Sequence, residues 1–256
     1  MSKFLKYALP AAFISSLPVL ANAADAANLK SDDFVGISFW LISMALVAST
    51  AFFFLETQRV SAKWKTSLTV SGLVTLVAAV HYFYMREVWV ETGQSPTVFR
   101  YIDWILTVPL QMIEFYLILA AVTTVSVGVF NRLLVGTLVM LIGGYLGEAG
   151  IINAMLGFII GMAGWIYILY EIFAGEAGQK SVSCGSVGAQ MAFGACRMIV
   201  LVGWAIYPLG YLFGYLMGGV DAASLNLIYN LADFVNKIAF GVFIWAAAVA
   251  DSSETA

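Results

Sequence analysis

Apolar residues in this chain gather into seven long runs that short polar segments separate. The runs cover Phe34–Leu55, Thr66–Met85, Val98–Val122, Leu133–Gly147, Ile151–Phe173, Val187–Met217 and Ala222–Ala250. A helix needs roughly 17–25 mostly apolar residues to cross a bilayer, and most of the runs reach that length. The fourth is short, so we extend it back through Val127–Phe130. The pattern predicts an all-α membrane protein built as a bundle of seven transmembrane helices.

The composition supports this interpretation. Hydrophobic residues make up 62% of the chain and charged residues 11%, whereas soluble proteins carry about 25% charged residues. The formal charge of −3 gives no hint of nucleic-acid binding. We expect an integral membrane protein surrounded by lipid, with no metal site and no enzyme activity.

The first 23 residues have the pattern of a cleavable signal peptide. Lys3 and Lys6 precede a short apolar stretch, Tyr7–Leu20, and Ala21-Asn22-Ala23 fits an A-x-A cleavage site. The apolar part is too short for an eighth span. We therefore expect a signal peptide at residues 1–23 and one seven-helix domain at residues 24–256.

The loop charges predict the orientation in the membrane. Basic residues concentrate in the first, third and fifth loops, at Arg59, Lys63, Lys65, Arg132 and Lys180. Because basic loops stay on the cytoplasmic side, the N-terminus is expected outside and the C-terminus inside. In a bacterium, this corresponds to the inner membrane with a periplasmic N-terminus.

The fifth loop, Gly175–Gly188, is rich in glycine, and we expect it to be the most mobile segment. Cys184 lies in this loop, and Cys196 lies near the cytoplasmic end of the sixth run. Reducing conditions on that side argue against a disulfide, so both are expected to be free thiols.

Lys237 lies roughly midway along the last apolar run, one helical turn after Asp233. A lysine near the bilayer midplane costs about 2.5–3.5 kcal/mol on insertion scales, so a function or a partner is expected for it. Three uses are open: an ion pair with Asp233, a titratable site in a transporter, or a Schiff base with a carbonyl ligand. Lys237 alone does not decide among them.

The third run carries a second group of charges, Arg100, Asp103 and Glu114. At 100° per residue, Asp103 and Glu114 fall within about 20° of each other on one helix face, about 16 Å apart along the axis. Two acids stacked on one face, with an amine at middle depth, form a minimal proton wire. The alternative is a set of static pairs, Arg100 with Asp103 and Asp233 with Lys237.

Several other polar and aromatic side chains fall at the same depth. His81 is expected level with Asp103, where a hydrogen bond between the two is plausible. Trp204 and Tyr207 share one face of the sixth run, next to Pro208, and Trp104 adjoins Asp103. Such aromatics ordinarily pack in a core, and they would equally line a pocket for a long apolar ligand beside the lysine.

The segments Arg100–Glu114 and Asn230–Lys237 closely resemble the microbial rhodopsins, specifically the proteorhodopsins of marine bacteria. The likeness includes Gly147–Gly150 and Gly203–Pro208 and extends over essentially the whole mature chain. It implies seven helices around a pocket for all-trans retinal, bound covalently to Lys237 as a protonated Schiff base. It further implies light-driven proton export and a homo-oligomer of five or six copies.

The resemblance also implies a role for each matching residue. Asp103 matches the primary counterion and proton acceptor, Asp233 the second member of the counterion complex, and Glu114 the cytoplasmic proton donor. Gln111 occupies the spectral tuning position, where it implies a blue-absorbing pigment. The remaining matches are Arg100, which organises the counterions, Thr107 between acceptor and donor, His81 as partner of the acceptor, and the ligand-pocket residues Trp104, Trp204, Tyr207 and Pro208.

Two other functions compete with the outward proton pump. The first is a light sensor that signals to a partner protein, and the second is an ion-coupled transporter without retinal. Glu114 favours the pump over the sensor, because fast reprotonation matters to a pump and not to a receptor. A visible absorption band would exclude the retinal-free transporter.

Overall fold

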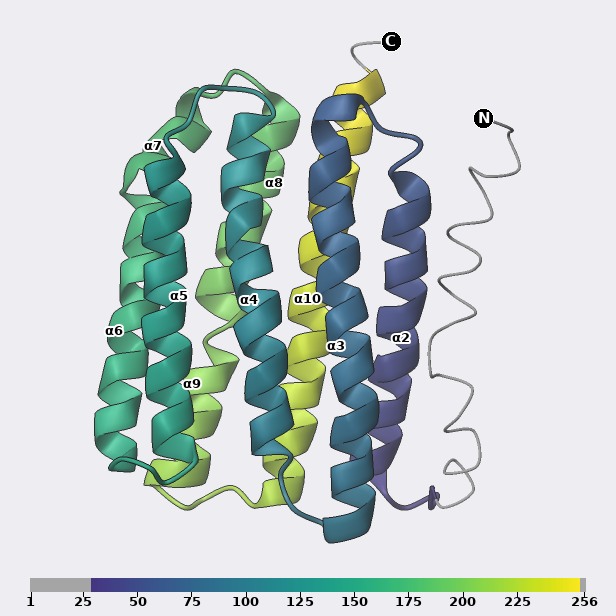
Figure 1. Cartoon of the computed structure of the whole chain (residues 1–256), viewed down its shortest axis with the longest axis vertical. Helices are drawn as coiled ribbons and strands as arrows, with labels where there is room; N and C mark the ends of the chain where they lie inside the picture. Colours follow the sequence, from purple (N-terminus) through teal and green to yellow (C-terminus); the bar gives the residue numbers. More distant parts are fainter. Residues whose placement is uncertain (1–28, 254–256) are drawn as a thin grey trace.

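Seven helical spans stand side by side in the computed structural model, which describes residues 29–253 (Figure 1). The predicted signal peptide lies outside the described residues. The first four spans are α2 (Phe34–Glu56), α3 (Lys65–Thr92, after a short 3₁₀ turn η3 at Ala62–Trp64), α4 (Thr97–Ala120) and α5 (Val127–Glu148). The fifth span comprises α6 (Ala154–Phe173) and α7 (Glu176–Ser183). The sixth comprises α8 (Val187–Met198), η4 (Ile199–Gly203), α9 (Ile206–Tyr211) and η5 (Leu212–Leu216). The seventh is α10 (Ala222–Ser253). The predicted all-α, seven-helix architecture is confirmed.

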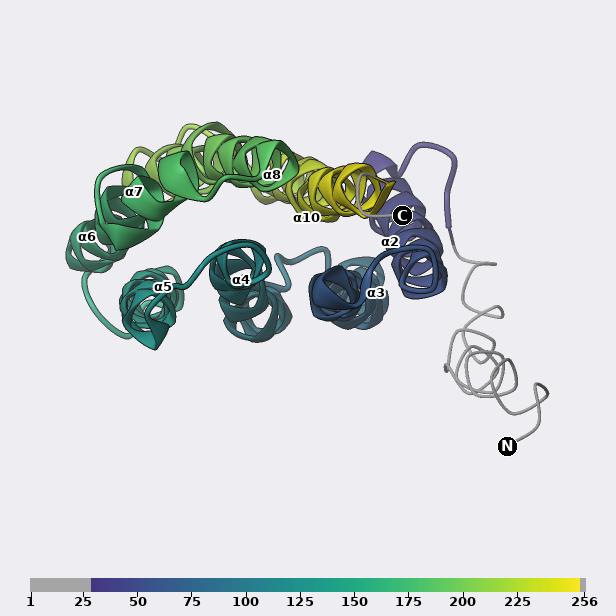
Figure 2. The same cartoon turned by 90° about the horizontal axis from the view of Figure 1, so that it is seen from above.

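Viewed along the bundle, the helices form two rows (Figure 2). Helices α3, α4 and α5 make one row, and α2, α10, α8 and α6 make the other. Helix α10 packs against α2, α3, α8 and α9, so its buried face lies near the centre of the bundle. The end that carries α7 and the last residues of α10 is called the α7 end below (Figure 1).

Helix α10 begins at a side-chain cap. The backbone N–H of Ser224 donates to Asp221 at 2.9 Å, and the Ser224 hydroxyl donates to the same carboxylate at 3.0 Å. These bonds hold the pKa of Asp221 below its usual range, and the backbone N–H of Ser224 has the largest effect. The cap fixes where the span that carries Lys237 starts.

The glycine-rich segment Gly175–Gly188 differs from the predicted mobile loop. Eight of its residues form α7, and α8 begins at Val187. Charged groups anchor the segment: Arg132 bonds Glu171 at 2.8 Å and Glu176 at 2.8 Å, and the N–H of Ala177 donates to Glu171 at 3.1 Å. These charge-assisted bonds order a sequence whose glycines alone would favour a flexible loop.

The sixth span is not a continuous α-helix. Between η4 and α9, the N–H of Trp204 bonds the carbonyl of Ile199, five residues back, as in a π-helix. Pro208 has no N–H to offer the Trp204 carbonyl, which instead accepts from Tyr207 at 3.1 Å. The interruption falls where Trp204, Tyr207 and Pro208 border a cavity.

Glycines bring α5 and α6 unusually close. A Cβ atom added to Gly157 would lie 2.7 Å from the Gly147 Cα, and one added to Gly164 would lie 2.5 Å from the Met140 nitrogen. Only glycine permits such a close approach of two helix backbones. The two helices thereby form one wall of the cavity described next.

Candidate functional site

A buried ion cluster joins α4 and α10. The Lys237 ammonium donates hydrogen bonds to Asp103 Oδ2 and, at 3.1 Å, to Asp233 Oδ2. The lysine side chain is 3% exposed, and both carboxylates are fully buried. Asp233 precedes Lys237 by one turn of α10, whereas Asp103 comes from α4, so the lysine holds the two helices together.

Arg100 lies at the outer edge of this cluster without pairing with Asp103. Its Nη2 donates to the side-chain oxygens of Asn226 at 2.9 Å and Asn230 at 3.0 Å, and its charge acts on Asp233. The static Arg100–Asp103 pair considered from the sequence is therefore wrong. Two cations face two carboxylates, and this balance is what makes four buried charges tolerable.

The two carboxylates differ in their remaining partners. Asp233 accepts from the hydroxyls of Tyr207 at 2.6 Å and Tyr82 at 2.9 Å, and from the Trp104 indole at 3.3 Å. Asp103 Oδ1 has no hydrogen-bond partner among the described residues. Asp233 is thus held as an anion by several donors, while Asp103 keeps an oxygen free to take a proton.

Two polar side chains beside Asp103 bond to backbone carbonyls. The Thr107 hydroxyl donates to the Asp103 carbonyl at 2.9 Å, one turn back. His81 acts electrostatically on Asp103, but its Nδ1 lies 2.8 Å from the Val77 carbonyl. The expected His81–Asp103 hydrogen bond is absent within residues 29–253, and the His81 Nδ1 contacts a carbonyl of its own helix.

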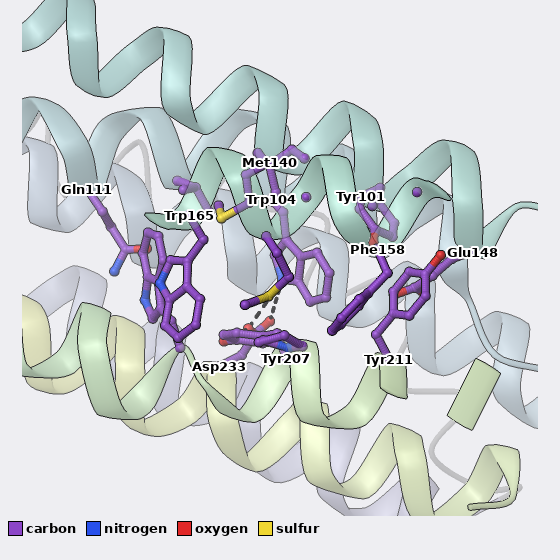
Figure 3. A pocket seen from close by; sticks show the side chains of 18 of the residues that line it. Tyr101, Trp104, Gln111, Met140, Glu148, Phe158, Trp165, Tyr207, Tyr211 and Asp233 are labelled. Carbon is purple, nitrogen blue, oxygen red and sulfur yellow. Dashed lines mark hydrogen bonds between the residues drawn. The ribbon is translucent and has the colours of Figure 1, made fainter. Parts of the chain in front are cut away.

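A cavity with aromatic walls opens beside the lysine (Figure 3). The predicted pocket residues Trp104, Gln111, Trp204, Tyr207 and Pro208 line it, together with Lys237 and Asp233. In Figure 3, Tyr207 lies near Asp233 at the centre, with Gln111 toward one end and Glu148 and Tyr211 toward the other. The opposite wall comes from α5 and α6, with Met140, Gly144, Phe158, Gly161 and Trp165.

Sequence reasoning missed this second wall and the Tyr82 contact. Met140, Phe158 and Trp165 sit in runs that are apolar on all sides, so nothing in their spacing marks them as pocket residues. The glycines were the usable signal, since Gly143, Gly147, Gly157, Gly161 and Gly164 recur at helical spacing in both runs.

Glu114 occupies a separate buried site nearer the α7 end. Its side chain is 1% exposed, Oε1 accepts from the Ser71 hydroxyl at 3.2 Å, and Oε2 has no partner in the described part of the chain. Next to it, the Phe115 ring contacts Phe193 at 5.0 Å and Phe240 at 5.7 Å between centroids. Asp103 and Glu114 are both buried on α4, and Glu114 makes no ion pair among residues 29–253.

The described residues contain no cluster of three or more histidine, cysteine or acidic side chains able to hold a metal ion. Cys184 and Cys196 are both buried and free. The site comprises the Lys237 amine, the carboxyls of Asp103, Asp233 and Glu114, and a cavity with aromatic walls that Glu148 also lines.

Comparison with known proteins gives consistent results. The family model of the bacteriorhodopsin-like proteins matches residues 33–250. Over 242 residues, covering 94% of this chain and 96% of each relative, the chain is 58% identical to the blue-light absorbing proteorhodopsin of Gamma-proteobacterium Hot 75m4 and 59% identical to the green-light absorbing proteorhodopsin of Gamma-proteobacterium EBAC31A08. The crystal structure of the blue light-absorbing proteorhodopsin from Med12 superimposes with a TM-score of 0.76 at 55% identity, covering 86% of this chain and all of that one.

Proposed function

We propose that this chain, which belongs to the bacteriorhodopsin-like family, is a light-driven outward proton pump. It is a multi-pass membrane protein of a retinal-binding family. The observation that carries the proposal is the position of the Lys237 amine, which lines the aromatic cavity and bonds two buried carboxylates at once. A third buried carboxyl, Glu114, lies apart from them toward the α7 end.

The cavity fits retinal by its chemistry. A long apolar polyene needs aromatic and aliphatic walls, which Trp104, Trp204 and Tyr207 provide, and its aldehyde needs a primary amine, which Lys237 provides. Condensation of the aldehyde with the amine releases water and leaves the nitrogen able to carry one proton. When bound, retinal would absorb the light. Its change of shape would turn this nitrogen from the side of Asp103 toward the side of Glu114.

Within this proposal, Asp103 receives the proton that leaves the Lys237 nitrogen. It is the hydrogen-bonded neighbour whose second oxygen is free, and Asp233 stays ionised because Tyr82 and Tyr207 donate to it. Arg100 keeps the cluster balanced before and after the transfer. The proton then leaves toward the Arg100 end of the bundle.

Glu114 returns a proton to the Lys237 nitrogen from the other side. Glu114 is buried, bonds a serine hydroxyl and forms no ion pair among residues 29–253. Such a carboxyl is more stable with its proton than without it, so it can act as a donor. Thr107 lies on α4 between the two acids. Opposite surroundings thus assign acceptor and donor to two carboxyls on one helix.

We also propose that the pigment absorbs in the blue. The overall identities do not separate the two colour types, since they are 58% and 59%. The proposal rests on Gln111, which lines the cavity and donates to the Asn236 carbonyl at 3.4 Å. A polar amide at that point stabilises the ground-state charge distribution of the chromophore and so widens the excitation gap.

The remaining features of the proposal concern placement. The positive loops favour a bacterial inner membrane with the N-terminus in the periplasm and the α7 end in the cytoplasm. Assembly as a homo-oligomer of five or six copies and removal of a signal peptide at residues 1–23 stay predictions.

Illumination of cells that express the protein with added retinal tests the function. We expect an unbuffered medium to acidify in the light, and the signal to vanish with a protonophore or after Lys237→Ala. The light sensor predicts a coloured protein and no sustained pH change. A retinal-free transporter predicts no visible band.

A further inference from the structure

Asp251, near the end of α10, connects three chain segments at the α7 end. Its Oδ2 accepts from the Trp64 indole at 2.8 Å and from the Lys63 ammonium at 2.7 Å, and its Oδ1 accepts from the Ser186 hydroxyl at 3.2 Å. Asp251 is 9% exposed and Trp64 has no exposed surface, so the bond between them is shielded from water, whereas the Lys63 side chain is 36% exposed. None of these residues belongs to the proposed proton path.

Each partner marks the beginning of another span. Trp64 is the last residue of η3 and precedes α3, and Ser186 is the N-cap of α8, where it accepts from the Ala189 N–H at 3.2 Å. Close by, the Ser61 N–H donates to the Ser252 hydroxyl at 2.8 Å. Asp251 therefore holds the starts of α3 and α8 against the end of α10.

Trp64 lies on the face of α3 that also carries the partner of Glu114. It has no exposed surface, and Ser67 and Ser71 follow it at helical spacing on the buried face of α3. Ser71 is the residue that donates to Glu114. Trp64 therefore lies on the same side of α3 as the serine that bonds Glu114, nearer the α7 end.

We propose that Asp251 is a positioning residue for proton uptake: through Trp64 and Ser186 it keeps the bundle closed over Glu114 and slows the entry of the next proton. The set of Asp251, Trp64 and Ser186 is called the Asp251 latch. Moving the start of α8 away from α10 breaks the Ser186 bond, and moving Trp64 aside breaks the indole bond. This inference rests on the proposed role of Glu114 as donor.

Asp251→Asn tests the latch, since it keeps the size of the side chain and removes the charge. We expect proton uptake after a flash, followed with a pH dye, to become roughly three- to tenfold faster, because bonds to a charged acceptor hold the closed state. The colour and the first proton transfer should not change. Glu176→Gln is the matched control, because it removes a carboxylate bonded to Arg132 at the same end but not in the latch.

The native thiol of Cys196 provides a second readout. Cys196 is fully buried on α8 and close enough to Glu114 for the two groups to interact electrostatically. In a Cys184→Ser background, a small thiol reagent should modify Cys196 faster under illumination in Asp251→Asn than in the parent. Trp64→Phe, which removes the indole N–H and keeps a smaller aromatic ring, should also accelerate modification and serves if Asp251→Asn does not fold.

Uptake and thiol modification that stay unchanged in both variants would overturn the latch. Slower uptake in Asp251→Asn would also overturn it, by showing that the carboxylate collects protons. Failure of the proposed function is distinguishable, because the parent protein would then show no light-induced proton uptake at all.

Discussion

The Lys237 cluster and the Glu114 site both bury carboxyl groups, but in opposite surroundings. In the cluster, Asp103 and Asp233 face Lys237 and Arg100, so charge is balanced by charge. At the second site, Glu114 is buried, has a serine hydroxyl as its partner and forms no ion pair among the described residues. One environment stabilises carboxylates and the other stabilises a carboxylic acid.

In the proposed pump, this difference would let one helix carry both an acceptor and a donor. Both acids stand on the buried face of α4, so distance along the helix alone does not set their roles. Their partners from other helices do: Lys237 from α10 beside Asp103, and Ser71 from α3 beside Glu114. Changes to either environment should therefore separate the two roles, and the following predictions run from the largest effect to the smallest.

Lys237→Ala should have the largest effect, the complete loss of the pigment. Among residues 29–253, Lys237 is the lysine that lines the cavity, so its removal leaves retinal no amine to condense with. The measurement is the visible spectrum after adding retinal, with Lys63→Ala as the control that keeps its colour. A visible band in the Lys237 variant would refute the lysine assignment.

Asp103→Asn should stop proton export and shift the absorption to the red. The substitution removes the free acceptor oxygen and the negative charge that stabilises the protonated nitrogen. Lowering the pH should produce the same red shift in the parent protein, because protonation of Asp103 removes the same charge, and no such shift should remain in the variant.

Spectra recorded during an acid titration check this prediction. Asp33→Asn, which alters a helix cap outside the cavity, should titrate like the parent. A red shift that persists in Asp103→Asn would assign the titrating group elsewhere, with Asp233 as the next candidate.

Glu114→Gln should leave the colour nearly unchanged and slow the return of a proton to the Lys237 nitrogen by about a hundredfold or more, the usual contribution of a positioned acid. Flash photolysis measures this rate directly. Glu87→Gln, an exposed carboxyl on α3, is the control. An unaltered rate in the Glu114 variant would transfer the donor role to another group.

Gln111→Leu should have the smallest effect, a shift from blue to green absorption with pumping intact. Leu removes the amide dipole from the cavity wall without touching Asp103 or Glu114. The spectrum and the light-induced pH change are measured on the same cells, with the exposed Gln190→Leu as control. An unmoved band would show that Gln111 does not tune the chromophore.

The sequence predicted the seven spans because each is a long apolar run, and it placed Lys237, Asp103 and Glu114 correctly as buried residues because intramembrane charges are rare. On α4 and the sixth span it also predicted five residues that line the cavity and missed three others. The predicted ones are Trp104, Gln111, Trp204, Tyr207 and Pro208, and the missed ones are Tyr101, Val108 and Tyr211. Spacing along one helix placed Asp103 with Glu114 and Trp204 with Tyr207, whereas Gln111 was assigned from the resemblance to the proteorhodopsins.

The sequence did not predict most hydrogen bonds between side chains of different helices. The bonds of Arg100 to Asn226 and Asn230 and of Tyr82 to Asp233 depend on how spans rotate against each other. The ordering of Gly175–Gly188 depends on Arg132, more than forty residues earlier in the chain. Neither rotation nor such distant pairing leaves a periodic signal in a single sequence.

Time-resolved infrared spectroscopy of the carboxyl groups tests the division between acceptor and donor most directly. We predict that a protonated-carboxyl band absent in Asp103→Asn appears as the Lys237 nitrogen loses its proton. A second band, absent in Glu114→Gln, should then disappear as the nitrogen regains one. A single carboxyl that both gains and loses the proton, or the two bands in reverse order, would contradict the account.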